Sequence, residues 1–348
     1  MSTDSNLKSL LIEEAALARG LPCTRLDHYL VDVRIHGRSH LFLQMCGPSS
    51  SAAGKYLGDR KHLTRACLAA ADLPMVEARD FGPGEVDEAV AYASALGFPV
   101  VVKPASLWKG VGVTTMLESP EAVRGAITHA LSLVSGEYAR FLVERQFEGG
   151  ASYRFLVVGE RVIGATRKVA AFVVGDGRAS ILELIERKNA LRRASRFYGS
   201  RLIPTERALL ARLVRSDRVL DHVPADGERV QLQDVENAQN GGEHEDVLDT
   251  MHPAYLEHAV RSVRALPGLH YGGVDMFVRD PAAPPRPGSL DCAVSEIEFS
   301  PAPAATFPFV GEPRDIAGAI LEFYLDRPEA GYGEPVRSAA LGEAAVGG

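Results

Sequence analysis

The sequence has few of the residues on which covalently linked or metal-bound scaffolds depend. Its four cysteines are scattered over 348 residues, and none forms a Cys-x-x-Cys pair or a mixed Cys/His spacing. This spacing argues against both a disulfide framework and a structural zinc site. We therefore expect reduced thiols in a cytoplasmic protein.

Long apolar runs are also missing. The longest near the amino terminus is Leu10-Leu11-Ile12, which is too short for the apolar part of a signal peptide. No other stretch approaches the roughly 18 consecutive apolar residues that a membrane-crossing helix needs. The sequence therefore predicts a cytoplasmic protein without a membrane partner.

Neither sign of charge dominates. The 45 acidic and 38 basic residues give a net charge of −7, so no overall positive field attracts nucleic acid, and we predict no nucleic-acid partner. Lysine is scarce, with 7 residues against 31 arginines. The position of each lysine is therefore informative.

Two common nucleotide-binding motifs are absent. The sequence contains no G-x-x-x-x-G-K-[ST] P-loop. Gly110-Val111-Gly112 follows a predicted strand, but it lacks the third glycine and the following helix of a dinucleotide-binding turn. Any nucleotide site must therefore be built from other residues.

What is present indicates a globular protein of the α+β class. The chain is 46% hydrophobic and 24% charged, and its length predicts two or three domains at about 100 to 200 residues each. Residues 47–54 and the proline-rich residues 281–288 are predicted as loops, the first flexible and the second an exposed hairpin loop. Hydrophobic spacing predicts helices at 5–20, 59–71, 86–95, from 120, 181–189, 205–218 and 253–266, and strands at 29–35, 39–45, 98–104, 113–117, 141–146, 153–158, 162–168, 272–278 and 294–299.

One lysine stands at a predicted strand end, and three acidic residues stand on two later predicted strands. Lys103 can reach a phosphate there, and the glycines after it allow close approach of an anion. Glu296 and Glu298 are two residues apart and project from one face of their strand, while Asp275 comes from the neighbouring strand. Three such carboxylates suit Mg²⁺. An ordinary surface lysine and a solvated strand face remain the alternatives.

Seven short motifs follow one another between residues 41 and 325. They are F-P-V-V-V-K-P at 98–104, K-G-V-G-V at 109–113, V-E-R at 143–145 with Y-R-F-L-V-V at 153–158, V-G-D-G at 174–177 with I-L-E-L-I at 181–185, N-G-G at 240–242, G-V-D at 273–275 and E-I-E at 296–298. In this order the motifs resemble the ATP-grasp ligases, within the branch that contains cyanophycin synthetase and the bifunctional glutathione synthetases.

The resemblance implies an α+β ATP-grasp fold, in which two α+β lobes clasp ATP and a short amino-terminal domain precedes them. The implied parts are an amino-terminal (pre-ATP-grasp) domain at 1–73, a small lid subdomain at 74–146, a large subdomain with the metal site at 147–327 and a flexible tail at 328–348.

The resemblance also implies roles for individual residues. Lys61 and Lys103 contact phosphates, and Glu144 accepts a hydrogen bond from the adenine amino group. The implied nucleotide-binding residues are Lys61, Lys103, Lys109, Gly110, Gly112, Glu144, Arg145, Phe147 and Ser152; the implied ligands of two Mg²⁺ ions, with Mn²⁺ as a substitute, are Asp275, Glu296 and Glu298; and the residues implied to act on the phosphoryl group or the substrates are Arg154, Arg167, Lys168 and Asn240.

Three positions depart from the family pattern. Ser152 stands where relatives carry an acidic residue that binds the ribose hydroxyls, and Glu298 stands in place of an asparagine. Trp108 puts an indole in the glycine-rich loop, where it either stacks on a ligand or packs within a lid.

The implied function is ATP-dependent joining of a carboxylate to an amine through an acyl phosphate, with release of ADP and phosphate. The substrates are small molecules, expected to be amino acids or a short peptide joined by a γ-glutamyl or dipeptide bond. The sequence lacks the second ligase domain that cyanophycin synthetase and the bifunctional glutathione synthetases carry, and we therefore expect a stand-alone ligase. A homodimer is compatible with this expectation. The alternatives are an ATP-grasp small-molecule kinase and a non-catalytic ATP-binding module.

Overall fold

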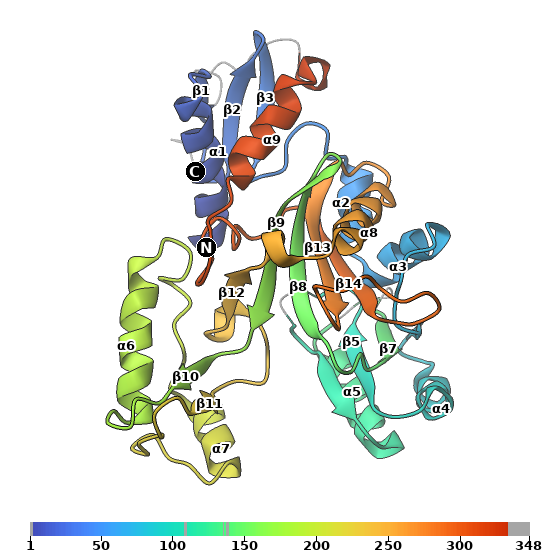
Figure 1. The fold of residues 1–348 in the computed structure, drawn as a ribbon. Coiled ribbons are helices and arrows are strands. Elements are labelled where there is room, and N and C mark those ends of the chain that lie inside the picture. The colour runs from blue at the N-terminus through green and yellow to red at the C-terminus, as the bar shows by residue number, and fades with distance from the viewer. Residues whose placement is uncertain (1–2, 108–109, 135, 137–138, 333–348) are drawn as a thin grey trace, which may run out of the picture. The chain divides into compact units, whose positions relative to one another are not determined.

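The computed structural model describes residues 3–107, 110–134, 136 and 139–332 (Figure 1). The chain divides into two compact units, each assembled from separate stretches of sequence. The first unit comprises Met1–Ser49, Ile163–Leu248 and Ser300–Gly348, and the second comprises Ser50–Val162 and Asp249–Phe299. The predicted segments 1–73, 74–146, 147–327 and 328–348 stay a prediction. No helix in the described part of the chain is both long and apolar enough to cross a membrane.

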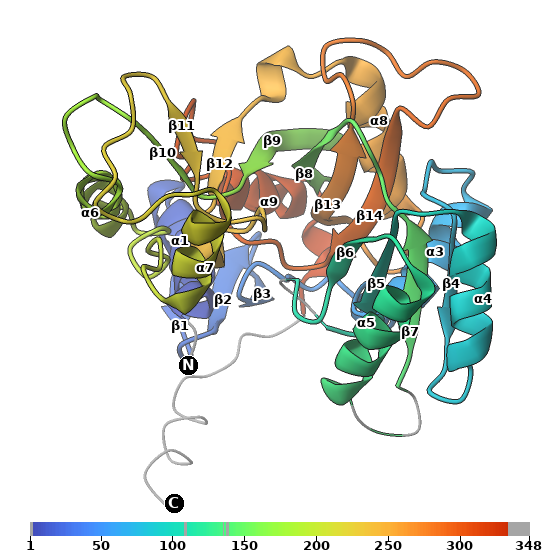
Figure 2. The same cartoon turned by 90° about the horizontal axis from the view of Figure 1, so that it is seen from below.

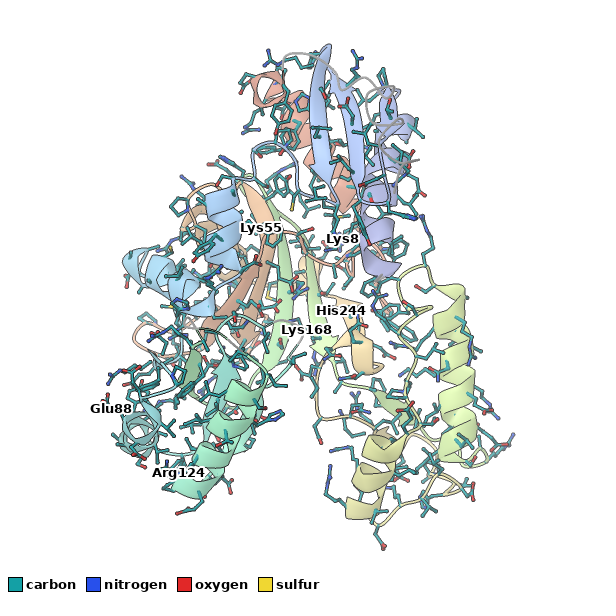
Figure 3. All side chains as sticks on the ribbon, turned by 180° about the vertical axis from the view of Figure 1, so that it is seen from behind. Lys8, Lys55, Glu88, Arg124, Lys168 and His244 are labelled. Atoms are coloured by element: carbon teal, nitrogen blue, oxygen red, sulfur yellow. The ribbon has the colours of Figure 1, made fainter. Side chains whose placement is uncertain are left out.

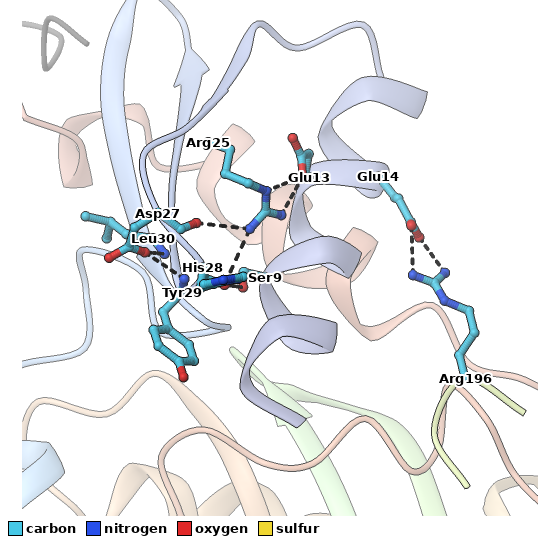
Figure 4. Close-up of polar contacts among 9 residues, drawn as sticks. All are labelled: Ser9, Glu13, Glu14, Arg25, Asp27, His28, Tyr29, Leu30 and Arg196. Atoms are coloured by element: carbon cyan, nitrogen blue, oxygen red, sulfur yellow. Dashed lines mark hydrogen bonds and ion pairs between the residues drawn. The ribbon is translucent and has the colours of Figure 1, made fainter. Parts of the chain in front are cut away.

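The first unit contains a three-stranded antiparallel sheet, β1-β2-β3, near α1 and α9. In Figure 4, Glu13 and Glu14 of α1 pair with Arg25 and Arg196, with N–O distances of 2.9 Å and 2.8 Å. The elements of this unit are α1 (Thr3–Ala18), β1 (Cys23–Arg25), β2 (Leu30–Ile35), β3 (Arg38–Leu43), β9 (Arg161–Val169), β10 (Phe172–Val174), α6 (Ile181–Ala194), α7 (Arg207–Arg215), β11 (Arg229–Gln231), β12 (Glu243–Asp246) and α9 (Ile316–Leu325), with short 3₁₀ turns at Ala238–Asn240 and Pro328–Ala330.

The second unit contains the strand order β4-β7-β5-β6 and the antiparallel strands β8, β13 and β14. Figure 2 shows α5 lying along β5, β6 and β7, and the core between them is apolar. The elements of this unit are α2 (Ala52–Gly58), α3 (Lys61–Ala70), β4 (Ala78–Phe81), α4 (Val86–Leu96), β5 (Val100–Pro104), β6 (Thr114–Leu117), α5 (Pro120–Ser132), β7 (Phe141–Arg145), β8 (Ala151–Val158), α8 (Pro253–Arg264), β13 (Tyr271–Val278) and β14 (Cys292–Glu298).

Local sequence explains where the helices begin. Ser119 caps α5 by accepting from the Ala122 amide, and Pro120 occupies the first helical position. Ser180 and Glu183 form a reciprocal capping box at the start of α6. These residues mark the helix starts in the sequence as well, and both helices were predicted.

Several elements were not predicted from the sequence, among them α9, β1, β4, β10 and β11, and two further segments show why. Residues 47–54 are not wholly a loop, because Ser51 caps α2 and Gly54 is buried so close to Gly268 that a Cβ would lie 2.7 Å from the backbone. Strand β12 was not predicted, since Glu243-His244-Glu245-Asp246 has no apolar alternation. The ion pair between Lys188 and Glu243, at 2.7 Å, lets this polar strand be buried.

Gly241, in the predicted Asn240-Gly-Gly242 motif, offers a test of this packing. It has φ = 84°, and a Cβ would lie 2.8 Å from the Ile203 Cα. Gly227 has φ = 77° with nothing within 4 Å. Gly227→Ala should therefore lower the free energy of unfolding by about 1–2 kcal/mol, and Gly241→Ala by about 1–3 kcal/mol more because of overpacking. Urea unfolding of both variants measures the difference, and equal losses would show that Ile203 imposes no constraint.

Candidate nucleotide site

A pocket in the second unit gathers residues from both of its strand sets. Its polar and charged lining residues come from the start of α3, from β5 and β6, from β7 and the residue after it, and from β14. The lining residues are Lys61, Val76, Val101, Lys103, Leu107, Gly110, Val113, Thr115, Glu144, Arg145, Gln146, Phe147, Phe277, Ser295 and Glu296. The structure thus brings together six of the predicted nucleotide-binding residues and one predicted metal ligand.

A buried ion pair crosses the strands on one wall of the pocket. Val101 pairs with Glu144 in the β5–β7 register, which places Lys103 and Glu144 on the same face as diagonal neighbours. The Lys103 Nζ lies 2.8 Å from Glu144 Oε1, and both side chains are less than a tenth exposed. Glu144 Oε2 is buried without a hydrogen bond, although Arg65 Nη1 lies 3.9 Å away. This oxygen can accept a hydrogen bond from a ligand in the pocket.

One end of the pocket is apolar. Val76, Phe147 and Ala293 form a buried cluster, and Phe277 packs against it. The rings of Phe147 and Phe277 are stacked, with centroids 5.5 Å apart and planes 16° apart. Flat aromatic surface beside an unsatisfied carboxylate oxygen suits a planar heterocycle that carries an amino group.

The other end of the pocket is charged. Lys61, the first residue of α3, lies 3.0 Å from Glu296 Oε1 and donates to the Leu107 carbonyl at 2.6 Å. Its own amide donates to the Ala105 carbonyl, which fixes the start of α3 beside the end of β5. This arrangement brings a lysine, the glycine-rich loop and a carboxylate to one place.

The predicted carboxylates lie on two neighbouring strands and form a row with Arg154 of a third strand. In register, Arg154 of β8 faces Asp275 of β13, which faces Glu296 of β14, and Glu298 faces Gly273. Arg154 Nε and Nη2 lie 2.7 Å and 2.8 Å from the Asp275 oxygens, and Arg154 Nη1 lies 2.9 Å from Glu298 Oε2. Although burial lowers the pKa of Arg154, Asp275 and Glu298 together raise it above its ordinary value.

These carboxylates have the chemistry of a Mg²⁺ site, in which hard oxygen ligands are provided by neighbouring strands. Within the described ranges, no three acidic, histidine or cysteine side chains are grouped closely enough to hold a metal ion. The carboxylates are balanced by Lys61 and Arg154 instead. The donor set therefore fits a divalent cation in kind, and the two basic side chains neutralise it in this arrangement.

Other predicted residues of the second unit differ in placement. Arg145 is partly exposed and lies 3.5 Å from Glu77. Ser152 faces Phe277 in the β8–β13 register but does not line the pocket. Gly112 has φ = 73°, and a Cβ there would lie 2.8 Å from the Pro104 ring. Lys109, like Trp108, lies outside the described residues.

Three predicted residues belong to the first unit. Arg167 and Lys168 are successive residues of β9 and point to opposite faces, so they cannot share one role. Lys168 pairs in register with His244, which Figure 3 shows beside it, whereas Arg167 Nη1 lies 3.8 Å from Glu245. Asn240 ends an exposed 3₁₀ turn.

Sequence reasoning missed several lining residues. Val76 and Thr115 carry no chemical motif, and Gln146 was included only as the last residue of a predicted strand. Ser295 enters the pocket because the register shifts between Asp275 and Met276, leaving it unpaired in a β-bulge. No residue type in that segment indicates such a bulge from the sequence.

Arg154→Met tests the charge balance in the row. Removing the guanidinium takes a buried cation away from the buried Asp275 and the partly exposed Glu298, so the free energy of unfolding at pH 7 should fall by about 3–5 kcal/mol. Chemical unfolding at pH 7 measures the loss. Arg264→Met, which breaks the exposed pair with Glu160, is the control and should cost under about 1 kcal/mol. Equal losses in the two variants would contradict the balance.

Comparisons with known proteins agree with this geometry. Residues 59–199 match the family described as carbamoyl-phosphate synthase L chain, ATP binding domain. The chain is 28% identical over 325 residues to a cyanophycin synthetase of Trichormus variabilis, covering 92% of this chain and 35% of the relative. It is 30% identical over 278 residues to the glutathione biosynthesis bifunctional protein GshAB of Pasteurella multocida, covering 78% and 36%.

A solved structure agrees as well. The bifunctional glutathione synthetase from Pasteurella multocida superposes with a TM-score of 0.69 at 24% identity, over 93% of this chain and 44% of that one. The chain spans about a third of the length of its curated relatives. The predicted α+β ATP-grasp fold is confirmed, and the chain belongs to the ATP-grasp family.

Proposed function

We propose that the chain catalyses ATP-dependent ligation of a small carboxylic acid to an amine. The observation that carries the proposal is a single pocket with an apolar end, a buried lysine–carboxylate pair and a charged end. The apolar end suits the base of ATP, and the charged end suits its phosphates. The names of the relatives, cyanophycin synthetase and a glutathione biosynthesis protein, support ligation of amino acids or a short peptide.

In the nucleotide complex, Glu144 Oε2 accepts a hydrogen bond from the adenine amino group, and the adenine ring lies beside the aromatic rings of the apolar end. Lys103 then contacts a phosphate while it retains its pair with Glu144. Lys61 neutralises charge on the phosphates that lie farther from the base. The backbone of the loop at Gly110 and Gly112 approaches the same phosphates. Glycines suit this position because they let backbone amides come close to oxyanions.

Asp275, Glu296 and Glu298 would hold Mg²⁺, which would neutralise charge on the phosphates during transfer. Arg154 then serves to orient Asp275 and Glu298, because Nε, Nη1 and Nη2 are all directed at their oxygens. The resemblance implies that Arg154 contacts the transferred phosphoryl group. The contacts of Arg154 support its role in orienting the carboxylates better than this one. The number of ions, and Mn²⁺ in place of Mg²⁺, belong to the proposal.

The reaction consists of two displacements. A carboxylate oxygen of the acid attacks the γ-phosphorus, and the bond to ADP breaks. The amine nitrogen then attacks the acyl carbon, phosphate leaves and the nitrogen loses a proton. The residues of the first unit proposed to act on the substrates are Lys168, Arg167 and Asn240. Because Arg167 and Lys168 point to opposite faces of β9, only one of these two can contact a substrate. Cytoplasmic location, a γ-glutamyl or dipeptide product and a homodimer are parts of the same proposal.

Hydroxylamine trapping tests the ligase reaction. Incubated with ATP, Mg²⁺ and amino-acid candidates, the chain should release ADP and phosphate in equal amounts and convert the activated acid to a hydroxamate. Chromatography separates ADP from AMP, and mass spectrometry identifies the hydroxamate. AMP as the stoichiometric nucleotide product would contradict γ-phosphoryl transfer. A stable phosphorylated product that neither hydroxylamine nor any amine converts would indicate a kinase.

Lys103→Met tests the nucleotide site. The loss of a charge-assisted phosphate contact should weaken ATP binding by about 1.5–3 kcal/mol, measured by calorimetry. Because this variant leaves Glu144 buried and unpaired, Lys103→Met with Glu144→Gln provides a neutral pair that preserves folding. Arg124→Met is the control on the exposed face of α5, where Arg124 lies 2.6 Å from Asp87 (Figure 3). Wild-type affinity in both Lys103 variants would remove Lys103 from the site.

A further inference from the structure

Ser295 is a half-buried pocket residue to which the family pattern assigns no role. It lies in β14 at the bulge, since Asp275 pairs with Glu296 whereas Met276 pairs with Val294. The bulge leaves Ser295 without a partner on β13 and brings both Ser295 and Glu296 into the pocket lining. Its hydroxyl makes no hydrogen bond with the described part of the chain.

The position of Ser295 along β14 is informative. Two residues before it, Ala293 belongs to the apolar cluster with Phe147. Immediately after it, Glu296 pairs with Lys61 at the charged end. Ser295 therefore marks the boundary between the two ends of the pocket. In an ATP molecule bound along this axis, the ribose occupies that boundary.

Ser152 does not provide the alternative contact. It faces Phe277 across the β8–β13 register, yet it is absent from the pocket lining. Thr115 of β6 is the other hydroxyl side chain in the lining, and it comes from the strand that follows the glycine-rich loop. Along β14, Ser295 is the hydroxyl residue that stands between Ala293 of the apolar cluster and Glu296 of the Lys61–Glu296 pair.

We propose that Ser295 binds a ribose hydroxyl of the nucleotide and takes over the sugar contact at a site without the acidic residue. A serine hydroxyl can both donate to and accept from a sugar hydroxyl, so neither group is left unpaired. This inference rests on the proposed function, because it requires ATP in the pocket. It assigns a specificity for the sugar that the carboxylates and lysines do not provide.

The test compares ATP with 2′-deoxy-ATP and 3′-deoxy-ATP, using calorimetry on the full chain without acid or amine substrates. One neutral hydrogen bond corresponds to about a 3- to 10-fold change in affinity. Wild type should bind one deoxynucleotide weaker than ATP by this factor. Ser295→Ala should bind ATP weaker by a similar factor and no longer distinguish ATP from that deoxynucleotide. Thr115→Val and Ser152→Ala, as matched hydroxyl deletions, should preserve the wild-type ratio.

Several results would overturn the assignment. They are equal binding of all three nucleotides by wild type, an unchanged ratio in Ser295→Ala, and loss of the ratio in Ser152→Ala or Thr115→Val. If wild type binds no ATP, both this inference and the proposed function fail. If wild type binds ATP and forms a hydroxamate while Ser295→Ala keeps the wild-type ratio, only the sugar assignment fails. Thermal unfolding of each variant confirms that the compared proteins are folded.

Discussion

The arrangement of the second unit depends on balancing carboxylates that would otherwise repel one another. Asp275, Glu296 and Glu298 project from one face of two neighbouring strands, where burial makes their mutual repulsion costly. Lys61 comes from α3 to neutralise one of them, and Arg154 comes from β8 to neutralise the other two. The same charges that a phosphate–metal complex would use therefore also hold α3, β8, β13 and β14 together.

Lys103 and Glu144 show how such a pair can serve both stability and recognition. Each strand alone would bury a charge at considerable cost, and pairing across β5 and β7 compensates for it. Only one Glu144 oxygen is used by the lysine, and the second lacks a hydrogen bond. Burial of a paired carboxylate with an unsatisfied acceptor is costly for folding alone, and it becomes favourable once a donor enters the pocket.

The sequence predicted the parts of the candidate site that consist of charged residues at regular spacing along strands. Lys103 at the end of an apolar strand, and Glu296 with Glu298 at a spacing of two, could be placed because strand alternation fixes their faces. Ser295 could not be placed, because a one-residue bulge moves it into the pocket. Strand β12 could not be predicted either, because pairing of Glu243 with Lys188 permits a polar strand where hydrophobic alternation gives no signal.

Two of the three departures from the family pattern compensate for each other in charge. Ser152 in place of an acidic residue removes one negative charge near the apolar end, and Glu298 in place of an asparagine adds one beside Asp275. The added carboxylate lies 2.9 Å from Arg154 Nη1, which already binds Asp275 through its other nitrogens. Because one guanidinium offers five donors in a plane, it can neutralise Glu298 without giving up Asp275. Under the proposed binding of ATP, negative charge is thus concentrated among the strand carboxylates, and the sugar is left to neutral hydroxyl groups, which would bind a neutral ribose without burying an unpaired charge.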